Sequence, residues 1–124
     1  MSRLMSVAFT EQAVVERRKT VTRRKGWPML KPGDRLTLCR KVMGRKKGEP
    51  LVRVAEVEVV SVRREPLCAI AGDASDLGAA ELAREGFTDI SHIEFMDRYF
   101  SPQGVGPMDD VTRIEWRYLD GGTS

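Results

Sequence analysis

The sequence RRKTVTRRKGWPMLKPGDRL, residues 17–36, joins a dense basic run to a turn and the start of a strand. Six of its first nine residues are cationic, and the hydroxyl groups of Thr20 and Thr22 lie between them. Val21 and its two threonine neighbours are β-branched and favour extended backbone. The KPGD segment at 31–34 is typical of a turn. We therefore expect an extended basic segment that a turn leads into a strand.

Upstream of this run, the residues favour a strand followed by a helix. The apolar residues 4–9 predict a short strand. Thr10 is a suitable N-cap for a helix that continues to Arg17 or Arg18, and Glu11 falls in the first turn, where the helix dipole favours an anion. The basic run therefore begins where this helix is expected to end.

Downstream of the turn, two strands are expected to form a hairpin. Apolar and polar residues alternate over 35–42, and valines carry a longer strand over 52–64. The glycine-flanked basic residues of 44–48 lie between them and predict a long loop. The alternation slips near Ala55 and again at Val59-Val60, which predicts a bulge or a barrel bend in the longer strand.

The rest of the chain predicts two helices and a closing strand. Residues 73–76 are expected to open a short helix that runs to Ala83 or Arg84 and ends at Gly86. A capping-box pattern, Ser91 with Glu94, then starts a second helix. The apolar face of that second helix is expected to consist of Ile93, Phe95, Met96, Tyr99 and Phe100. A Gly/Pro-rich loop leads to a strand over 111–119, with Ile114, Trp116 and Tyr118 on one face.

Residues 1–124 have the length and composition of one globular domain. Helices set into the connections of about five strands indicate the α+β class, and a small curled sheet or β-barrel is expected, since an isolated hairpin is unstable. No apolar run reaches the ~18 residues that a membrane helix needs, and no signal-peptide core is present. We therefore expect a cytoplasmic protein, and the isolated Cys39 and Cys68 fit that reducing compartment.

The net charge of +3 conceals two halves of opposite sign. Residues 1–50 contain 14 Lys/Arg and 4 Asp/Glu, a charge of +10, whereas residues 51–124 contain 7 and 14, a charge of −7. The alternative to a functional surface is a solvated face that happens to be lopsided. Because the basic residues are bunched, we favour a face that binds a polyanion.

The order of these motifs resembles a known family. Lys19-Thr20-x-Thr22 followed by two arginines, a short loop and KPGDRL at 31–36 resembles the start of ASCH domains of the PUA-like superfamily. Residues 85–87, 91–95 and 111–119 resemble later parts of that family, so the resemblance spans nearly the whole chain. It is strongest to short phage-encoded members and more distant to small bacterial N4-acetylcytidine amidohydrolases. It implies a PUA-like β-barrel with a cleft beside the first helix, and RNA or a nucleotide as ligand.

The same resemblance implies a candidate catalytic site. Lys19, Thr22 and Glu85 occupy the positions that match the amidohydrolase site. A threonine hydroxyl needs a base to become nucleophilic, and a lysine beside Arg17, Arg18 and Arg23 would have its charged form disfavoured, while Glu85 is suited to move a proton. In the alternative, Lys19 contacts phosphate, Thr22 bonds to backbone and Glu85 merely precedes a helix end.

The chain also departs from the amidohydrolases. It has Arg17 and Arg18 where the family often has glycine, and Arg23-Arg24 where those enzymes tend to have Ile-Arg. These changes, with the basic tip at 45–47, favour a polyanionic ligand. We therefore predict an RNA-favouring nucleic-acid or nucleotide binding domain, with amidohydrolase and then ribonuclease as alternatives. The expected nucleic-acid-binding residues are Arg17, Arg18, Lys19, Thr20, Arg23, Arg24, Lys25, Trp27, Arg45, Lys46 and Lys47. Of these, Arg17, Arg18, Arg23, Arg24 and the basic tip at 45–47 are expected to border one concave surface.

The other candidate residues are weaker. Trp27 is equally suited to stack on a base or to pack under the Pro28 turn. His92 is the only histidine, which excludes sites that need two histidines. Asp109-Asp110 is more typical of a solvated loop than of a metal site. We therefore expect no metal and no cofactor.

Overall fold

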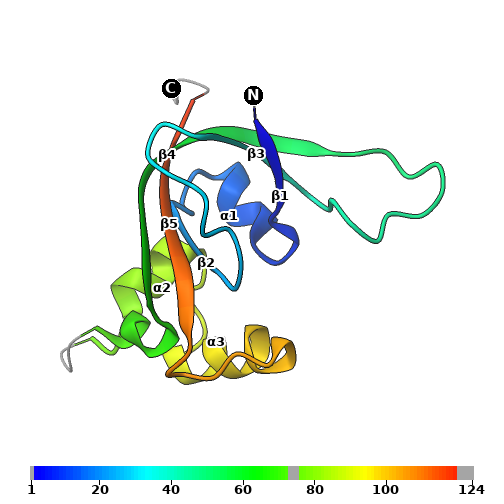
Figure 1. Ribbon diagram of the computed structural model, residues 1–124. Coiled ribbons are helices and arrows are strands. Elements are labelled where there is room, and N and C mark those ends of the chain that lie inside the picture. Colours follow the sequence, from blue (N-terminus) through cyan, green and yellow to red (C-terminus); the bar gives the residue numbers. More distant parts are fainter. Residues whose placement is uncertain (1, 73–75, 120–124) are drawn as a thin grey trace.

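A curved five-stranded sheet forms the frame of the protein. Figure 1 shows the computed structural model, which describes residues 2–72 and 76–119. The strands are β1 (Arg3–Ser6), β2 (Val21–Arg24), β3 (Arg35–Cys39), β4 (Arg53–Pro66) and β5 (Asp110–Tyr118), in the spatial order β1-β3-β4-β5-β2. β1 pairs with β3 in parallel and all other pairs are antiparallel. The sheet forms a half-barrel, and the predicted α+β class with about five strands is confirmed.

Three short helices lie in the connections between strands. They are α1 (Glu11–Val15), α2 (Ala79–Glu85) and α3 (His92–Tyr99). Figure 1 shows the sheet wrapping around α1, while α2 and α3 lie together toward the other end of β5. Shorter 3₁₀ turns cover Ala8–Thr10, Leu67–Ala71 and Ser101–Gln103. No helix within the described residues is long and apolar enough to cross a membrane.

The bend of β4 comes from two bulges, at the places where its alternation slips. Between the pairs Leu38↔Ala55 and Cys39↔Arg53, Val54 is an extra residue on β4. Between Val59↔Trp116 and Ser61↔Glu115, Val60 is a second extra residue. A bulge bends a strand and increases its twist, so one continuous strand can pair with β3 at one end and β5 at the other. The prediction of bulges at these places is confirmed.

Two hydrophobic clusters fill the fold. The first lies between the half-barrel and α1 and includes Val14, Leu38, Ile114 and Trp116, all at most 2% exposed. The second lies among Leu67–Ala71, α2, α3 and the start of β5. Trp27 packs against the first cluster, which favours the packing alternative for this residue over base stacking.

Several predicted boundaries were wrong. The first strand ends at Ser6, so Phe9 lies in a turn rather than in a strand. The first helix stops at Val15, because Arg17 adopts a left-handed φ of 63° that ends helical backbone, and the Thr10 side chain makes no cap bond. The strand expected to reach residue 42 ends at Cys39.

The helical region contains a further correction and a confirmation. The helix expected to open at 73–76 begins at Ala79, after a turn over 76–78, and 73–75 lie outside the described residues. The capping box of α3 is confirmed, because Ser91 Oγ accepts from the Glu94 amide and the Glu94 carboxylate accepts from the Ser91 amide. Ile93 is 63% exposed and does not belong to the apolar face, which turns Phe95 and Phe100 inward.

Candidate functional site

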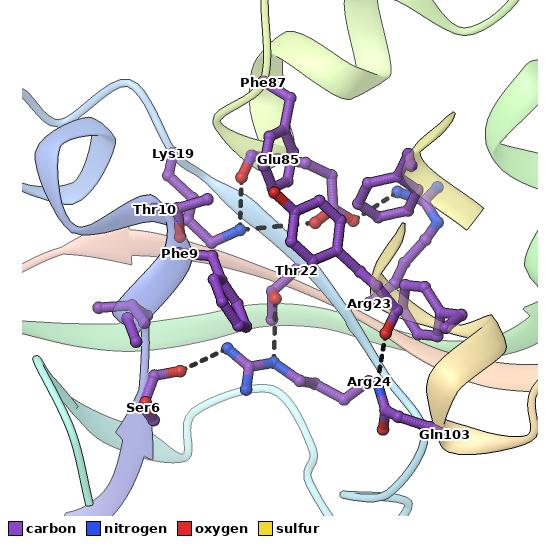
Figure 2. Close-up of a pocket in the computed structure, with 15 residues that line it drawn as sticks. Ser6, Phe9, Thr10, Lys19, Thr22, Arg23, Arg24, Glu85, Phe87 and Gln103 are labelled. Atoms are coloured by element: carbon purple, nitrogen blue, oxygen red, sulfur yellow. Dashed lines mark hydrogen bonds and ion pairs between the residues drawn. The ribbon is translucent and has the colours of Figure 1, made fainter. Parts of the chain in front are cut away.

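A cavity of about 160 Å³ opens beside the turn that follows β1, next to β2. This volume is close to the roughly 150 Å³ that holds one benzene ring in a protein interior. Figure 2 shows the side chains that line it. Its polar side is formed by Lys19, Thr22, Arg24 and Glu85, and its apolar side by rings from the turn at Phe9, from α3 and from Phe87. The three predicted catalytic side chains therefore line one space, although Glu85 lies 66 residues after Lys19.

The backbone at Lys19 is fixed by the closing strand. The Lys19 carbonyl accepts hydrogen bonds from Trp116 Nε1 at 3.0 Å and from the Tyr118 hydroxyl at 2.5 Å. The Lys19 amide donates to the Ala13 carbonyl at 3.2 Å. These three bonds set the direction of the lysine side chain, which is directed into the cavity (Figure 2) and only 2% exposed as a residue.

The Lys19 ammonium group is buried against Glu85. Its Nζ donates to the Glu85 carbonyl oxygen at 2.5 Å and lies 3.5 Å from Glu85 Oε1. Burial lowers the pKa of Lys19 from 10.5 to about 8; the Glu85 carboxylate opposes this shift, and the charges of Arg24 and Arg23 add to it. The direction agrees with the sequence prediction, but desolvation is the main cause.

Glu85 is held by the way α2 ends. Gly86 has a φ of 106°, a left-handed conformation that favours glycine, and it closes the helix directly after Glu85. A Cβ atom at this position would lie 3.1 Å from the Ala13 and Thr10 side chains, so the turn packs closely on α1. The Glu85 side chain is thereby placed inside the fold, with Oε2 accepting from Arg23 Nη1 at 2.9 Å.

Arg23 does not present its charge to an external ligand. Its guanidinium donates to Glu65 at 3.1 Å, to Glu81 at 2.7 Å and to Glu85 at 2.9 Å, and its side chain is 1% exposed. Arg113 donates to the same Glu81 at 2.6 Å. Burial raises the pKa of Glu81, but the hydrogen bonds from Arg113 and Arg23 outweigh this effect and lower the pKa to about 2. Arg23 is thus the centre of a buried ion-pair network, which the basic-face prediction did not foresee.

Arg24 differs from Arg23 in what it contacts. Its Nε donates to Thr22 Oγ1 at 3.1 Å and its Nη2 donates to the Ser6 carbonyl at 2.7 Å. Both acceptors are neutral, and among the described residues no carboxylate lies within ion-pair distance of Arg24. Burial lowers the pKa of this guanidinium, and the charge of Glu85 opposes the shift. Two polar groups therefore face the cavity. Thr22 presents a hydroxyl that accepts from Arg24, and Arg24 presents a guanidinium that still has unused N–H donors.

The remaining predicted contact residues of the basic run do not line the cavity. The guanidinium of Arg17 lies 4.8 Å from the centre of the Tyr118 ring, and Arg18 pairs with Glu16 at 2.6 Å. The Thr20 hydroxyl accepts from Arg84 at 3.4 Å. Lys25 is exposed and donates to the carbonyl of Gln103, a residue that does line the cavity, so Lys25 flanks the mouth.

The basic tip is separate from the cavity. Residues 45–47 lie in the loop between β3 and β4, which Figure 1 shows projecting away from the sheet and helices. None of them lines the cavity. The prediction that the tip and the basic run share one concave face was therefore wrong, because the β3–β4 hairpin extends beyond the half-barrel instead of folding over it.

Sequence reasoning missed two parts of the site. The first is the aromatic wall, which we define as Phe9, Phe87 and Tyr99; Phe9 and Phe87 lie in irregular segments that carry no periodic signal. The second is the pair of anchors on β5, Trp116 and Tyr118, whose alternation predicted an inner face but not a bond to Lys19. No group of three His, Cys, Asp or Glu side chains that could hold a metal occurs within 2–72 and 76–119.

Comparison with known proteins identifies the fold through structure alone. No protein-family model matches the sequence, and no curated protein is similar to it. An ASCH protein from Zymomonas mobilis superposes with a TM-score of 0.58 at 15% identity, covering 92% of this chain and 65% of that one. A protein from Enterococcus faecalis gives 0.62 at 14%, covering 96% and 80%. An ASCH domain from Lactobacillus crispatus gives 0.54 at 13%, covering 94% and 79%.

This chain therefore spans about two thirds of the Zymomonas protein, at identities where only the fold is comparable. The resemblance seen in the motifs now has a counterpart in three dimensions. The protein has the fold of an ASCH domain.

Proposed function

We propose that the protein binds a nucleotide or a single-stranded nucleic acid, with RNA favoured, through the cavity beside β2. The observation that carries this proposal is Arg24, a cation at a ring-sized cavity whose described hydrogen bonds all go to neutral acceptors. Guanidinium groups are suited to phosphate and to base oxygens. The aromatic wall offers the opposite surface to the face of a base.

The position of the cations near the cavity limits how many phosphates one short strand can contact. Arg24 lines the cavity and Lys25 flanks its mouth, whereas the basic tip lies elsewhere. We therefore expect about two phosphate contacts from a short ligand. A longer strand has a second basic surface available at the tip, so affinity should rise with length beyond what the cavity alone provides.

Binding should depend on salt through these contacts. For single strands the slope of log affinity against log salt is about −0.7 per phosphate contact, so a cytidine octamer should give a slope near −1.4. Lys25→Gln should make the slope shallower by about 0.7. Arg117→Gln removes an exposed cation that pairs with Glu58, away from the cavity, and serves as the matched control with no change. Fluorescence anisotropy at several salt concentrations measures this, and a flat affinity would contradict the proposal.

A second candidate function, hydrolysis of an N4-acylated cytidine, is supported by the contacts of Lys19 and Thr22. The Lys19 Nζ atom has three positions besides its bond to carbon, and two of them carry N–H groups directed to the Glu85 carbonyl and carboxylate. In the neutral amine the third position is a lone pair. Thr22 Oγ1 accepts from Arg24, so its own proton is available for donation. Thr22 attacks the acyl carbon as its proton passes to Lys19, which then protonates the leaving exocyclic amine; water hydrolyses the resulting ester.

This reaction should require neutral Lys19. With a pKa of about 8, the rate of acetate release from N4-acetylcytidine should rise roughly tenfold from pH 7 to pH 9 and then level off. Thr22→Val and Lys19→Met should abolish release, and Thr22→Ser should retain part of it. Equal release by wild type and Lys19→Met, or none from wild type, would contradict this second function.

A further inference from the structure

One aromatic side chain at the cavity is left outside the hydrophobic core. Phe9 is 79% exposed and lies in the 3₁₀ turn Ala8–Thr10, which directs it to the mouth of the cavity. Its ring centre is 5.2 Å from that of Tyr99, and Tyr99 is in turn 5.0 Å from Phe87. Single exposed apolar residues are common on proteins, so exposure alone indicates nothing. The position of this ring, at the open end of an aromatic wall, is what distinguishes it.

The wall and the polar side of the cavity face the same space. Figure 2 shows Phe9 directed toward the region into which Lys19, Thr22 and Arg24 also point. A flat ligand lying against the wall therefore has its edge near two cations and a hydroxyl. That combination of a π face and polar edge groups is the chemistry of a nucleobase, and the ring-sized cavity leaves space for one base rather than a stacked pair.

We propose that Phe9, at the open end of the aromatic wall, is the residue that stacks on an unpaired nucleobase and so selects single strands at this site. The proposal rests on the binding function proposed above and specifies what enters the cavity. A base inside a duplex is covered on both faces and directs its pairing edge to its partner, so it has to leave the stack to reach the wall. The site should therefore select single strands over duplexes of the same sequence.

The test asks whether binding needs an aromatic ring at position 9 or only an apolar side chain there, and it uses an exposed apolar residue elsewhere as a control. The probe is a single-stranded cytidine octamer of RNA, read by anisotropy at constant salt. Phe9→Ala and Phe9→Leu should each weaken binding by between about fivefold and a hundredfold, the range seen when one base-stacking ring is lost. Phe9→Trp should retain the wild-type affinity. Ile93→Ala, at a residue 63% exposed on α3 that does not line the cavity, should change nothing.

Two further probes separate stacking from charge. An abasic octamer keeps the phosphates and should bind wild type and Phe9→Ala equally, and the salt slope should be the same for both proteins because no charge is removed. The same cytidine octamer paired with its complementary strand should bind more weakly than the single strand. Because Phe9 is mostly exposed, its variants should unfold at the wild-type urea concentration.

The outcomes distinguish this inference from the binding function itself. If wild type fails to bind the octamer, the proposed function fails and the inference fails with it. If wild type binds and Phe9→Ala or Phe9→Leu binds equally well, binding stands and the stacking role is overturned. A loss that is as large with the abasic probe as with the cytidine octamer would also overturn it, since that loss would not depend on a base.

Discussion

Arg23→Met is expected to lower the free energy of unfolding by about 3–5 kcal/mol at neutral pH, because it leaves three carboxylates without their shared cation. In the native structure the Arg23 guanidinium bonds to Glu65, Glu81 and Glu85, and all three are less than one fifth exposed at the side chain. Domains of this size have stabilities of about 5–15 kcal/mol, so the loss is a large share of the total. Urea unfolding followed by circular dichroism measures it.

A matched control uses the same carboxylate. Arg63 also bonds to Glu65, at 2.7 Å, but its side chain is 61% exposed, so Arg63→Met should cost at most about 1 kcal/mol. The pH dependence gives an independent check. The pKa of Glu81 is lowered from 4.5 to about 2, so its contribution is complete above pH 4.5 and is lost as pH falls toward 2. Similar losses for the two variants would refute the network as a source of stability.

Lys19→Met is expected to make the protein more stable while removing the acetate release proposed above. A pKa of about 8 in place of 10.5 means that folding disfavours the charged amine by roughly 3 kcal/mol at neutral pH. That value already includes the attraction of Glu85, but without the amine the buried Glu85 carbonyl loses its donor, which costs about 1 kcal/mol. The variant should therefore gain about 2 kcal/mol at pH 7, and acetate release, where present, should disappear.

The pH dependence of this gain identifies its cause. Below pH 8 the lysine is charged in both folded and unfolded protein, so the full difference between variant and wild type is present. Between pH 8 and 10.5 the folded lysine has lost its proton and the unfolded one has not, so wild type gains stability and the difference shrinks. Urea unfolding from pH 6 to pH 10 tests this. A variant less stable than wild type at pH 7 would mean that Lys19 contributes more as an ion-pair partner than its burial costs.

Local signals in the sequence predicted the parts of the fold that depend on neighbouring residues. The Ser91–Glu94 pattern predicted the capping box of α3, and the two breaks in the alternation of β4 predicted its two bulges. A capping box depends on residues three apart, and a bulge shows as a break in a fixed alternation, so both can be recognised in the sequence. Helix starts were less well predicted. Residues 76–78 form a turn in which Asp76 Oδ1 accepts from the Gly78 amide, and Gly78 lies against the Ile70 carbonyl, a tertiary contact that the local pattern does not reveal.

The direction of charged side chains could not be predicted from a basic run. Arg23 and Arg24 are adjacent and chemically identical, yet one is surrounded by Glu65, Glu81 and Glu85 and the other bonds to Thr22 and Ser6. The difference depends on where α2 packs, which is a tertiary property. The resemblance to the family predicted that Lys19, Thr22 and Glu85 lie in one site. Only the structure shows how deeply Lys19 is buried and that its carbonyl is bonded to β5.

The hydrogen bonds from β5 to Lys19 also determine when the cavity can form. Among the strands that the structure describes, β2 lies at the edge and pairs with β5 alone, and the Lys19 carbonyl accepts from side chains 97 and 99 residues later in the chain. At about 5–20 residues per second, roughly 5–20 s of synthesis separate the two segments. Throughout that interval residues 19–22 lack both the strand β5 and the hydrogen bonds from Trp116 and Tyr118. The cavity is therefore completed in a late step of folding, through pairings between distant segments of the kind that fold slowly.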